Sequence, residues 1–140
     1  MKISARNALQ GTISAITKGA VNAEVVIGLQ GQETIISVIT NASVERLGLE
    51  KGKGAFAIIK ASDVMVGKNV ESAKLSARNV LAGKVANLED GAVNSEVGIQ
   101  LPGGTVIVAS ITKESVKALG LKRGDPVSAI VKASHVLVGV

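Results

Sequence analysis

The pattern of apolar and polar residues along the chain is mainly that of short β-strands. Between positions 21 and 29, apolar residues fall on alternate positions, which is the period of a half-buried strand. The apolar face would carry Val21, Ala23, Val25, Ile27 and Leu29, with Asn22 and Glu24 opposite. The runs "ETIISVIT" and "AFAIIKA" lie between glycine-rich turns and predict two further strands, and "VMVG" closes the unit. "AFAIIKA" is apolar on both faces, so we expect it to be covered on both sides.

One short helix interrupts these strands. Thr40 is a suitable N-cap, "NASVERL" supplies about two turns, and Gly48 stands where a left-handed residue would end the helix. The same signals return at Thr112, "KESVKAL" and Gly120. The sequence therefore predicts two matching helices.

The chain is a tandem repeat. A shift of 72 positions aligns residues 1–68 with 73–140 without a gap, and roughly 33 of the 68 aligned pairs are identical. "SARN" occurs at residues 4–7 and 76–79, and "GAVNAEV" is followed 72 residues later by "GAVNSEV". We expect a first domain at 1–68, a polar linker at 69–73 and a second domain at 74–140.

Each repeat predicts five short strands and one short helix. The expected fold class is all-β with one short helix per repeat, arranged as two tandem OB-like antiparallel barrels. A unit of about 68 residues is marginally stable alone. The two copies should therefore pack on each other or on further chains.

Composition narrows the function. The chain has no cysteine, so disulfides and thiolate metal sites are excluded. Its net charge of +5 comes from scattered lysines and arginines. Phe56 is the one aromatic residue, which argues against an OB-type nucleic-acid binder because such proteins stack bases on aromatic side chains. A single histidine and the lack of a repeated carboxylate pair near a nucleophile argue against an enzyme. No apolar run spans a membrane and no secretion signal is visible, so we expect a soluble cytoplasmic protein.

Each copy carries a set of hydrogen-bond donors. On an extended strand, Ser4 and Arg6 would share a face. Lys60 interrupts an apolar run with Ser62 two residues on, where it either reaches the edge or meets an anion. Free amides and hydroxyls at 40–43 would add donors at the helix start. Because the set lacks a carboxylate, it suits a small oxyanion and not a divalent cation.

Four ordered motifs carry a family resemblance. "SARN", "GAVNAEV", "IT..S...LGL" and "KAS.V", present in both copies, resemble the molybdate-binding Mop domain of the wider TOBE class, and the tandem order resembles the di-Mop proteins. The resemblance implies barrels that assemble as homo-oligomers, with a trimer favoured. It implies molybdate or tungstate as the ligand, no bare metal cation, no organic cofactor, no nucleic-acid or membrane partner, and a role in molybdenum storage or homeostasis.

The resemblance also implies site residues. The main oxyanion site would use Ser4, Arg6, Thr40, Ser43, Lys60 and Ala61, repeated as Ser76, Arg78, Thr112, Ser115, Lys132 and Ala133. Ser62 and Ser134 join this set as neighbouring donors. A second kind of site, near a symmetry axis of the assembly, would use Gly19, Ala20, Val21, Asn22, Gly91, Ala92, Val93 and Asn94. Because the family's sites lie between domains, we expect one site to mix residues from different copies or chains.

Several alternatives remain open. Mop-type domains also serve as oxyanion-sensing modules of transport or regulatory systems, although neither a Walker motif nor a DNA-binding segment accompanies the two copies. Asn7 and Asn79 are expected to be architectural, and Glu24 and Glu96 to form cross-strand ion pairs. His135 is expected to be solvated or locally hydrogen-bonded, and Met65 to pack in the core.

Overall fold

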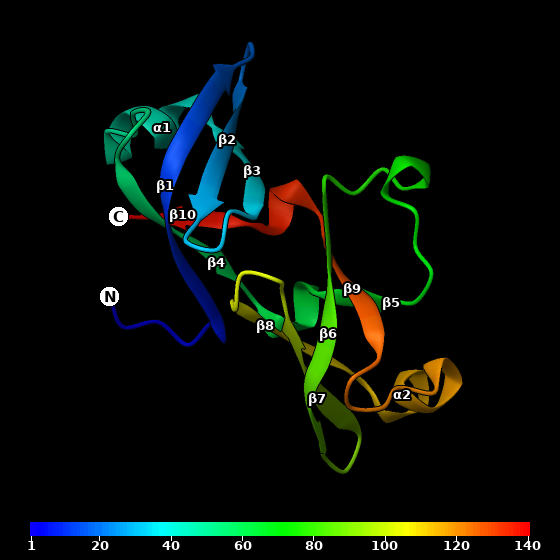
Figure 1. The fold of residues 1–140 in the computed structure, drawn as a ribbon. Coiled ribbons are helices and arrows are strands. Elements are labelled where there is room, and N and C mark those ends of the chain that lie inside the picture. Colours follow the sequence, from blue (N-terminus) through cyan, green and yellow to red (C-terminus); the bar gives the residue numbers. More distant parts are fainter.

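A computed structural model describes all of residues 1–140. Figure 1 shows two lobes, each built on one five-stranded antiparallel sheet with a short α-helix at its side. The first repeat forms β1 (Asn7–Lys18), β2 (Asn22–Leu29), β3 (Thr34–Thr40), α1 (Asn41–Leu47), β4 (Gly54–Ile59) and β5 (Met65–Gly67). The second forms β6 (Asn79–Asp90), β7 (Asn94–Gln100), β8 (Val106–Thr112), α2 (Lys113–Leu119), β9 (Pro126–Val131) and β10 (Leu137–Gly139).

The two repeats exchange their last strands. The sheet orders are β10-β4-β1-β2-β3 and β5-β9-β6-β7-β8, so β5 completes the second sheet and β10 completes the first. In Figure 1, the C-terminal segment accordingly crosses into the lobe formed by the N-terminal strands. The predicted fold class is confirmed, and the exchange is an addition that the sequence did not predict.

The helices begin and end where the sequence predicts. The Thr40 side chain accepts a hydrogen bond from the Ser43 amide at 3.1 Å, and Gly48 ends α1 with a left-handed φ of 60°. Thr112 and Gly120 do the same for α2, with a φ of 57° at Gly120. Local capping chemistry therefore sets both helices.

Three expectations about the strands are wrong in detail. Val21 lies in the turn before β2 and is 71% exposed, while the other four predicted apolar positions are buried. β1 starts at Asn7, so Ser4 and Arg6 precede the strand; the β1–β4 ladder stops at the Asn7–Ile59 pair because β4 ends there. After β4, residues 61–63 form a 3₁₀ turn, so Lys60 and Ser62 do not share a strand face.

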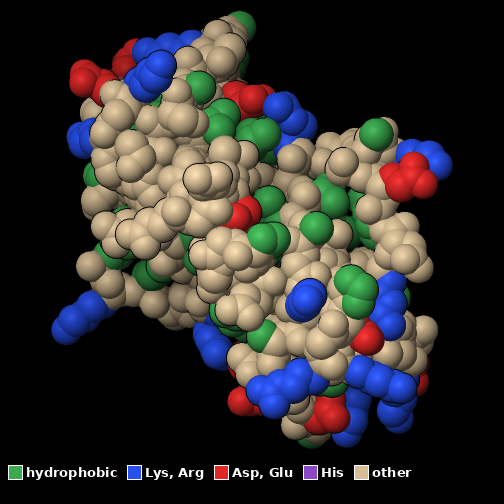
Figure 2. Space-filling view, viewed as in Figure 1, with side chains coloured by type: hydrophobic (Ala, Val, Ile, Leu, Met, Phe, Trp, Pro, Cys, Tyr) green, Lys and Arg blue, Asp and Glu red, His purple; other side chains and the backbone are tan.

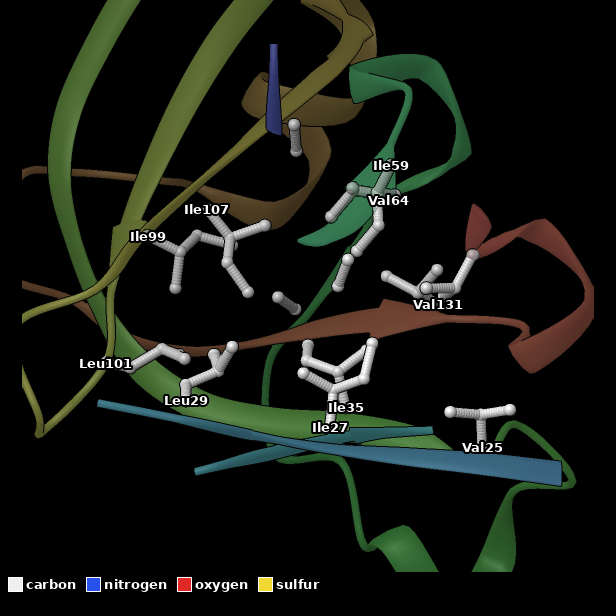
Figure 3. Packing of buried hydrophobic residues seen from close by; sticks show 14 of the residues in the cluster. Val25, Ile27, Leu29, Ile35, Ile59, Val64, Ile99, Leu101, Ile107 and Val131 are labelled. Carbon is white, nitrogen blue, oxygen red and sulfur yellow. The ribbon is translucent and has the colours of Figure 1, made fainter. Parts of the chain in front are cut away.

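One hydrophobic core runs through both lobes. A cluster of 24 buried residues includes Ile27 and Ile35 from the first repeat and Ile99 and Ile107 from the second. Figure 3 shows these side chains pointing toward one another from sheets of both repeats. The expected packing of the copies on each other is confirmed, although Met65 is not in the core: its side chain faces outward and it is 52% exposed.

Buried asparagines join the two repeats. Asn7 donates to the carbonyl oxygen of Val108 at 2.9 Å and accepts from the Val108 amide at 2.7 Å. Asn79 exchanges the corresponding pair of hydrogen bonds with Ile36, at 2.8 and 2.7 Å. Both side chains thus bond β-strands of the opposite repeat, which confirms their architectural role.

The turns before β3 and β8 meet between the lobes. A Cβ placed on Gly103 would lie 2.3 Å from the Cα of Gly31, and one placed on Gly31 would lie 2.5 Å from the Cα of Gly103. Because no side-chain carbon fits at such a distance from backbone, this contact requires glycine on both sides.

Candidate functional site

A cleft gathers most of the predicted first-copy donors. We call it the cross-repeat cleft, since it joins the segment before β1, the turn after β4 and the second repeat. Its lining consists of Ile3, Ser4, Ala5, Arg6, Ile58, Lys60, Ala61, Ser62, Glu96, Ser110 and Leu137. Five of the predicted site residues (4, 6, 60, 61 and 62) are therefore brought together.

The helix-start residues of the first copy are not in this cleft. The cleft instead shares Ser62 and Ser110 with an adjoining groove, which is lined by Thr112 and Ser115 at the start of α2. The donors of one copy thus adjoin the helix start of the other. This arrangement follows from the strand exchange, which carries Met65 and Val66 of the first repeat onto the second sheet beside the same groove.

The amides at the helix starts are less free than the sequence suggested. The Asn41 amide donates to the carbonyl oxygen of Val21 at 2.8 Å, and the Ser43 amide donates to Thr40. In the second copy, the Lys113 amide donates to the Val93 carbonyl at 3.0 Å. Hairpin turns and capping side chains therefore already satisfy several of these amides, while the hydroxyl groups of Thr112 and Ser115 lie 2.8 Å apart in the adjoining groove.

Each predicted site arginine is paired with a carboxylate of the opposite repeat. Arg6 Nη1 donates to Glu96 Oε2. Arg78 Nη1 and Nη2 donate to the two carboxylate oxygens of Glu24 at 2.6 and 3.0 Å. The hydrogen bond and the charge of Glu24 raise the pKa of Arg78 above its ordinary value. The expected ion pairs of Glu24 and Glu96 are confirmed, but they join the repeats and do not cross neighbouring strands.

The turn after β9 has the same backbone conformation as the turn after β4. Lys132 precedes a 3₁₀ turn at 133–135, as Lys60 precedes the turn at 61–63. Ser76, Lys132 and Ser134 are exposed, and Ala133 is buried. His135 and Asp63 occupy equivalent positions in these turns and lie 3.8 Å apart between Nδ1 and Oδ1. The His135 side chain is thus about half exposed (48%) beside one carboxylate, which agrees with the expected solvated or local role.

The predicted axis-type residues lie in hairpin turns at opposite ends of the molecule. Residues 19–22 join β1 to β2, and 91–94 join β6 to β7 (Figure 1). Val21 and Val93 are the most exposed large apolar residues of the chain. One chain does not bring these two turns together.

Two polar members of the cleft, Glu96 and Ser110, were not among the predicted site residues. Glu96 recurs as Glu24 at the same place in both "GAVN" motifs, which could have indicated a partner for the repeated arginine. Ser110 gave no such signal, because its counterpart in the first repeat is Val38. No group of three or more His, Cys, Asp or Glu side chains is placed to hold a metal ion. Neither helix is long and apolar enough to cross a membrane.

Comparison with known proteins finds relatives whose names refer to molybdenum. It is 43% identical over 140 residues to "Molybdenum transport protein ModE" of Azotobacter vinelandii and to "Molybdenum-pterin-binding protein MopA" of Rhodobacter capsulatus. The match covers 100% of this chain but 52% and 53% of those proteins, so the chain spans about half their length.

A solved structure is similar over the whole chain. The cytoplasmic molybdate-binding protein ModG, in a form with molybdate bound, superposes with a TM-score of 0.95 at 49% identity, covering 100% of this chain and 99% of that one. The TOBE domain model matches residues 3–66 and 75–138, which together make up most of the sequence. The chain therefore belongs to the TOBE domain family and contains two copies of the domain.

Proposed function

We propose that this protein binds molybdate, and also tungstate, as a molybdenum storage or homeostasis protein of the cytoplasm. The observation that carries the proposal is the cross-repeat cleft, where Ser4, Arg6 and Lys60 meet at one surface. Two cations and several short donors suit a tetrahedral dianion. The whole-chain likeness to ModG, which was solved with molybdate bound, supports the choice of anion.

The residues of the cleft would bind the anion in different ways. Arg6 offers a planar fork of N–H donors, Lys60 a mobile point charge, and Ser4, Ser62 and Ser110 short hydroxyl donors. The adjoining groove adds the hydroxyl groups of Thr112 and Ser115. The protein acts as a binder and not as a catalyst, because this set neither supplies an activated nucleophile nor surrounds a reacting bond.

Assembly with further copies would complete the remaining sites. The rim of the cleft exposes Ile3 and Leu137, and the hairpin turns expose Val21 and Val93. Exposed apolar side chains next to polar sites are typical of interfaces. We expect a homo-oligomer, with a trimer favoured, in which turns 19–22 and 91–94 of neighbouring chains form the axis-type sites.

Sensing within a transport or regulatory system is the second candidate. The observation in its favour is the relationship to ModE of Azotobacter vinelandii, of which this chain matches about half.

The surface charge does not favour nucleic-acid binding. On the face shown in Figure 2, Lys and Arg side chains gather mainly near the end that carries α2 and are interspersed with Asp and Glu. Such mixing differs from the continuous basic surface of a nucleic-acid binder.

Calorimetric titration tests the proposal. We expect molybdate and tungstate to bind and sulfate to bind far more weakly, with an oligomer detected by mass measurement in solution. The double variant Arg6→Ala/Arg78→Ala should lose the main class of sites and keep its fold, as monitored by circular dichroism. Equal affinity for sulfate, or unchanged molybdate stoichiometry in the double variant, would contradict the proposed site.

A further inference from the structure

The arginine–glutamate pairs described above occur twice under the internal symmetry. In each, an arginine from the segment before a repeat's first long strand reaches the second strand of the opposite repeat. Just over half of the 68 aligned positions differ between the copies, whereas the arginine and the glutamate of these pairs are the same in both. That both copies keep the same pairing indicates that it matters to the two sites.

The carboxylate belongs to the cleft itself. Glu96 lines the cross-repeat cleft together with Arg6 and Lys60. A dianion entering this cleft meets two cations, but it also meets one carboxylate at the arginine that it needs. Like charges at such short range repel, and the repulsion grows with the charge of the ligand.

The pairs are exposed enough to open. The side chains of Arg6 and Glu96 are 55% and 35% exposed, and those of Arg78 and Glu24 are 53% and 32% exposed. Ion pairs with this access to water are weak, and a released carboxylate is readily hydrated. An anion of higher charge can therefore replace the glutamate without a large cost to the fold.

We propose that Glu96 and Glu24 are internal competitors of the bound oxyanion: each holds its arginine while no anion is bound and must be displaced when the anion binds. The inference rests on the proposed function of the cross-repeat cleft and of the second-copy residues that correspond to it. Each glutamate then lowers the affinity of its site and favours release. A glutamate that merely orients the arginine would have the opposite effect, because its removal would weaken binding.

The test is the double variant Glu24→Gln/Glu96→Gln of the full chain. Glutamine keeps the length and hydrogen-bonding capacity of the side chain and removes its charge. We expect the molybdate affinity of the main sites to rise about three- to tenfold by calorimetry, through loss of the competition and of the repulsion. Circular dichroism and thermal unfolding should stay close to those of the unmodified protein.

A matched control separates the local effect from net charge. Glu50→Gln/Glu71→Gln also removes two carboxylates, at exposed positions outside the cleft, and should change affinity less than twofold. If Glu24→Gln/Glu96→Gln weakens molybdate binding, leaves it unchanged, or only matches the control, the inference is overturned while the proposed function stands. If the unmodified protein binds no molybdate, both fail together.

Discussion

The two repeats have matching strands and helix caps, yet they surround their sites with different side chains. Position 110 is a serine in the cross-repeat cleft, and its counterpart in the first repeat is Val38. Position 63 is an aspartate, and its counterpart is His135. The contrast shows that the duplicated framework is held constant by packing and backbone hydrogen bonding, whereas the surroundings of the two sites have become unequal.

The repeats also use different lysines to bind the carbonyl oxygen at the end of their helix. In the first, Lys53 donates to the carbonyl oxygen of Gly48 at the end of α1, at 3.0 Å. Its counterpart in the second is Asp125, and Lys68 donates instead to the Gly120 carbonyl, at 3.2 Å. Both helix ends thus receive a lysine, as the negative end of a helix favours, although the lysine comes from different places in the sequence.

The glycine contact between the repeats should be the least tolerant of change. Gly103→Ala brings a Cβ against the Gly31 backbone, so the two turns must separate, and we expect a loss of about 3 kcal/mol or more in the free energy of unfolding. Gly31→Ala should cost about the same. Urea denaturation measures both. Gly28→Ala is the control, because its nearest contact is an ordinary 3.7 Å. A loss no larger than that of the control would show that the turns move apart freely.

Replacing the two buried asparagines should lower the free energy of unfolding by slightly different amounts. Asn7 also donates to the Ile59 carbonyl of its own repeat at 3.2 Å, and so makes one more hydrogen bond than Asn79. Because unpaired buried backbone groups are costly, we expect losses of about 3 kcal/mol for Asn7→Ala and about 2 kcal/mol for Asn79→Ala. Equilibrium unfolding of the two variants checks the order. A larger loss for Asn79→Ala would contradict it.

The serine of the cross-repeat cleft, Ser110, should give the two classes of site different affinities for molybdate. A hydrogen bond to a charged group is worth about 1.5 kcal/mol or more, so Ser110→Val should weaken molybdate binding at one class of site about tenfold or more. Val38→Ser should strengthen binding at the other class and bring the two affinities together. Calorimetry resolves both effects, with Val26→Ser on a different strand as a control. No change in either titration would remove Ser110 from the site.

The smallest expected difference between the repeats is in how their stability depends on pH. A hydrogen bond from the Lys122 amide, and then one from Lys68, hold the pKa of Asp125 below its usual value. Its contribution to stability is therefore present above its unfolded pKa of about 4 and is lost as pH falls through its folded value. Thermal unfolding between about pH 2 and 5 should fall less steeply in Asp125→Asn. An unchanged slope would exclude this role.

Much of this architecture could be predicted because it depends on local chemistry. Alternating apolar residues gave β2, and Thr40 and Gly48 gave α1 with its caps. The exchange of β5 and β10 could not be predicted, because the ends of the two repeats have similar sequences and would suit either sheet. Met65 was misplaced for the same reason: on the exchanged strand it faces outward.

The site could be predicted in part. The cleft brings together Ser4, Arg6 and Lys60, but which helix start lies beside them depends on how the repeats pack. Glu96 was not predicted to line the site, because its contact with Arg6 exists only when β7 lies beside the segment before β1 of the opposite repeat. Sequence patterns describe each repeat, whereas these sites are properties of the pair.

The central claim is that both repeats build one molybdate site. Calorimetric double-mutant cycles test it most directly, by combining Lys60→Ala with Ser115→Ala and, as a matched control, Lys60→Ala with Ser43→Ala. We predict that Lys60 and Ser115 affect the same class of sites with non-additive free energies, and that Lys60 and Ser43 are additive. Coupling of Lys60 to Ser43 without coupling to Ser115 would contradict the claim.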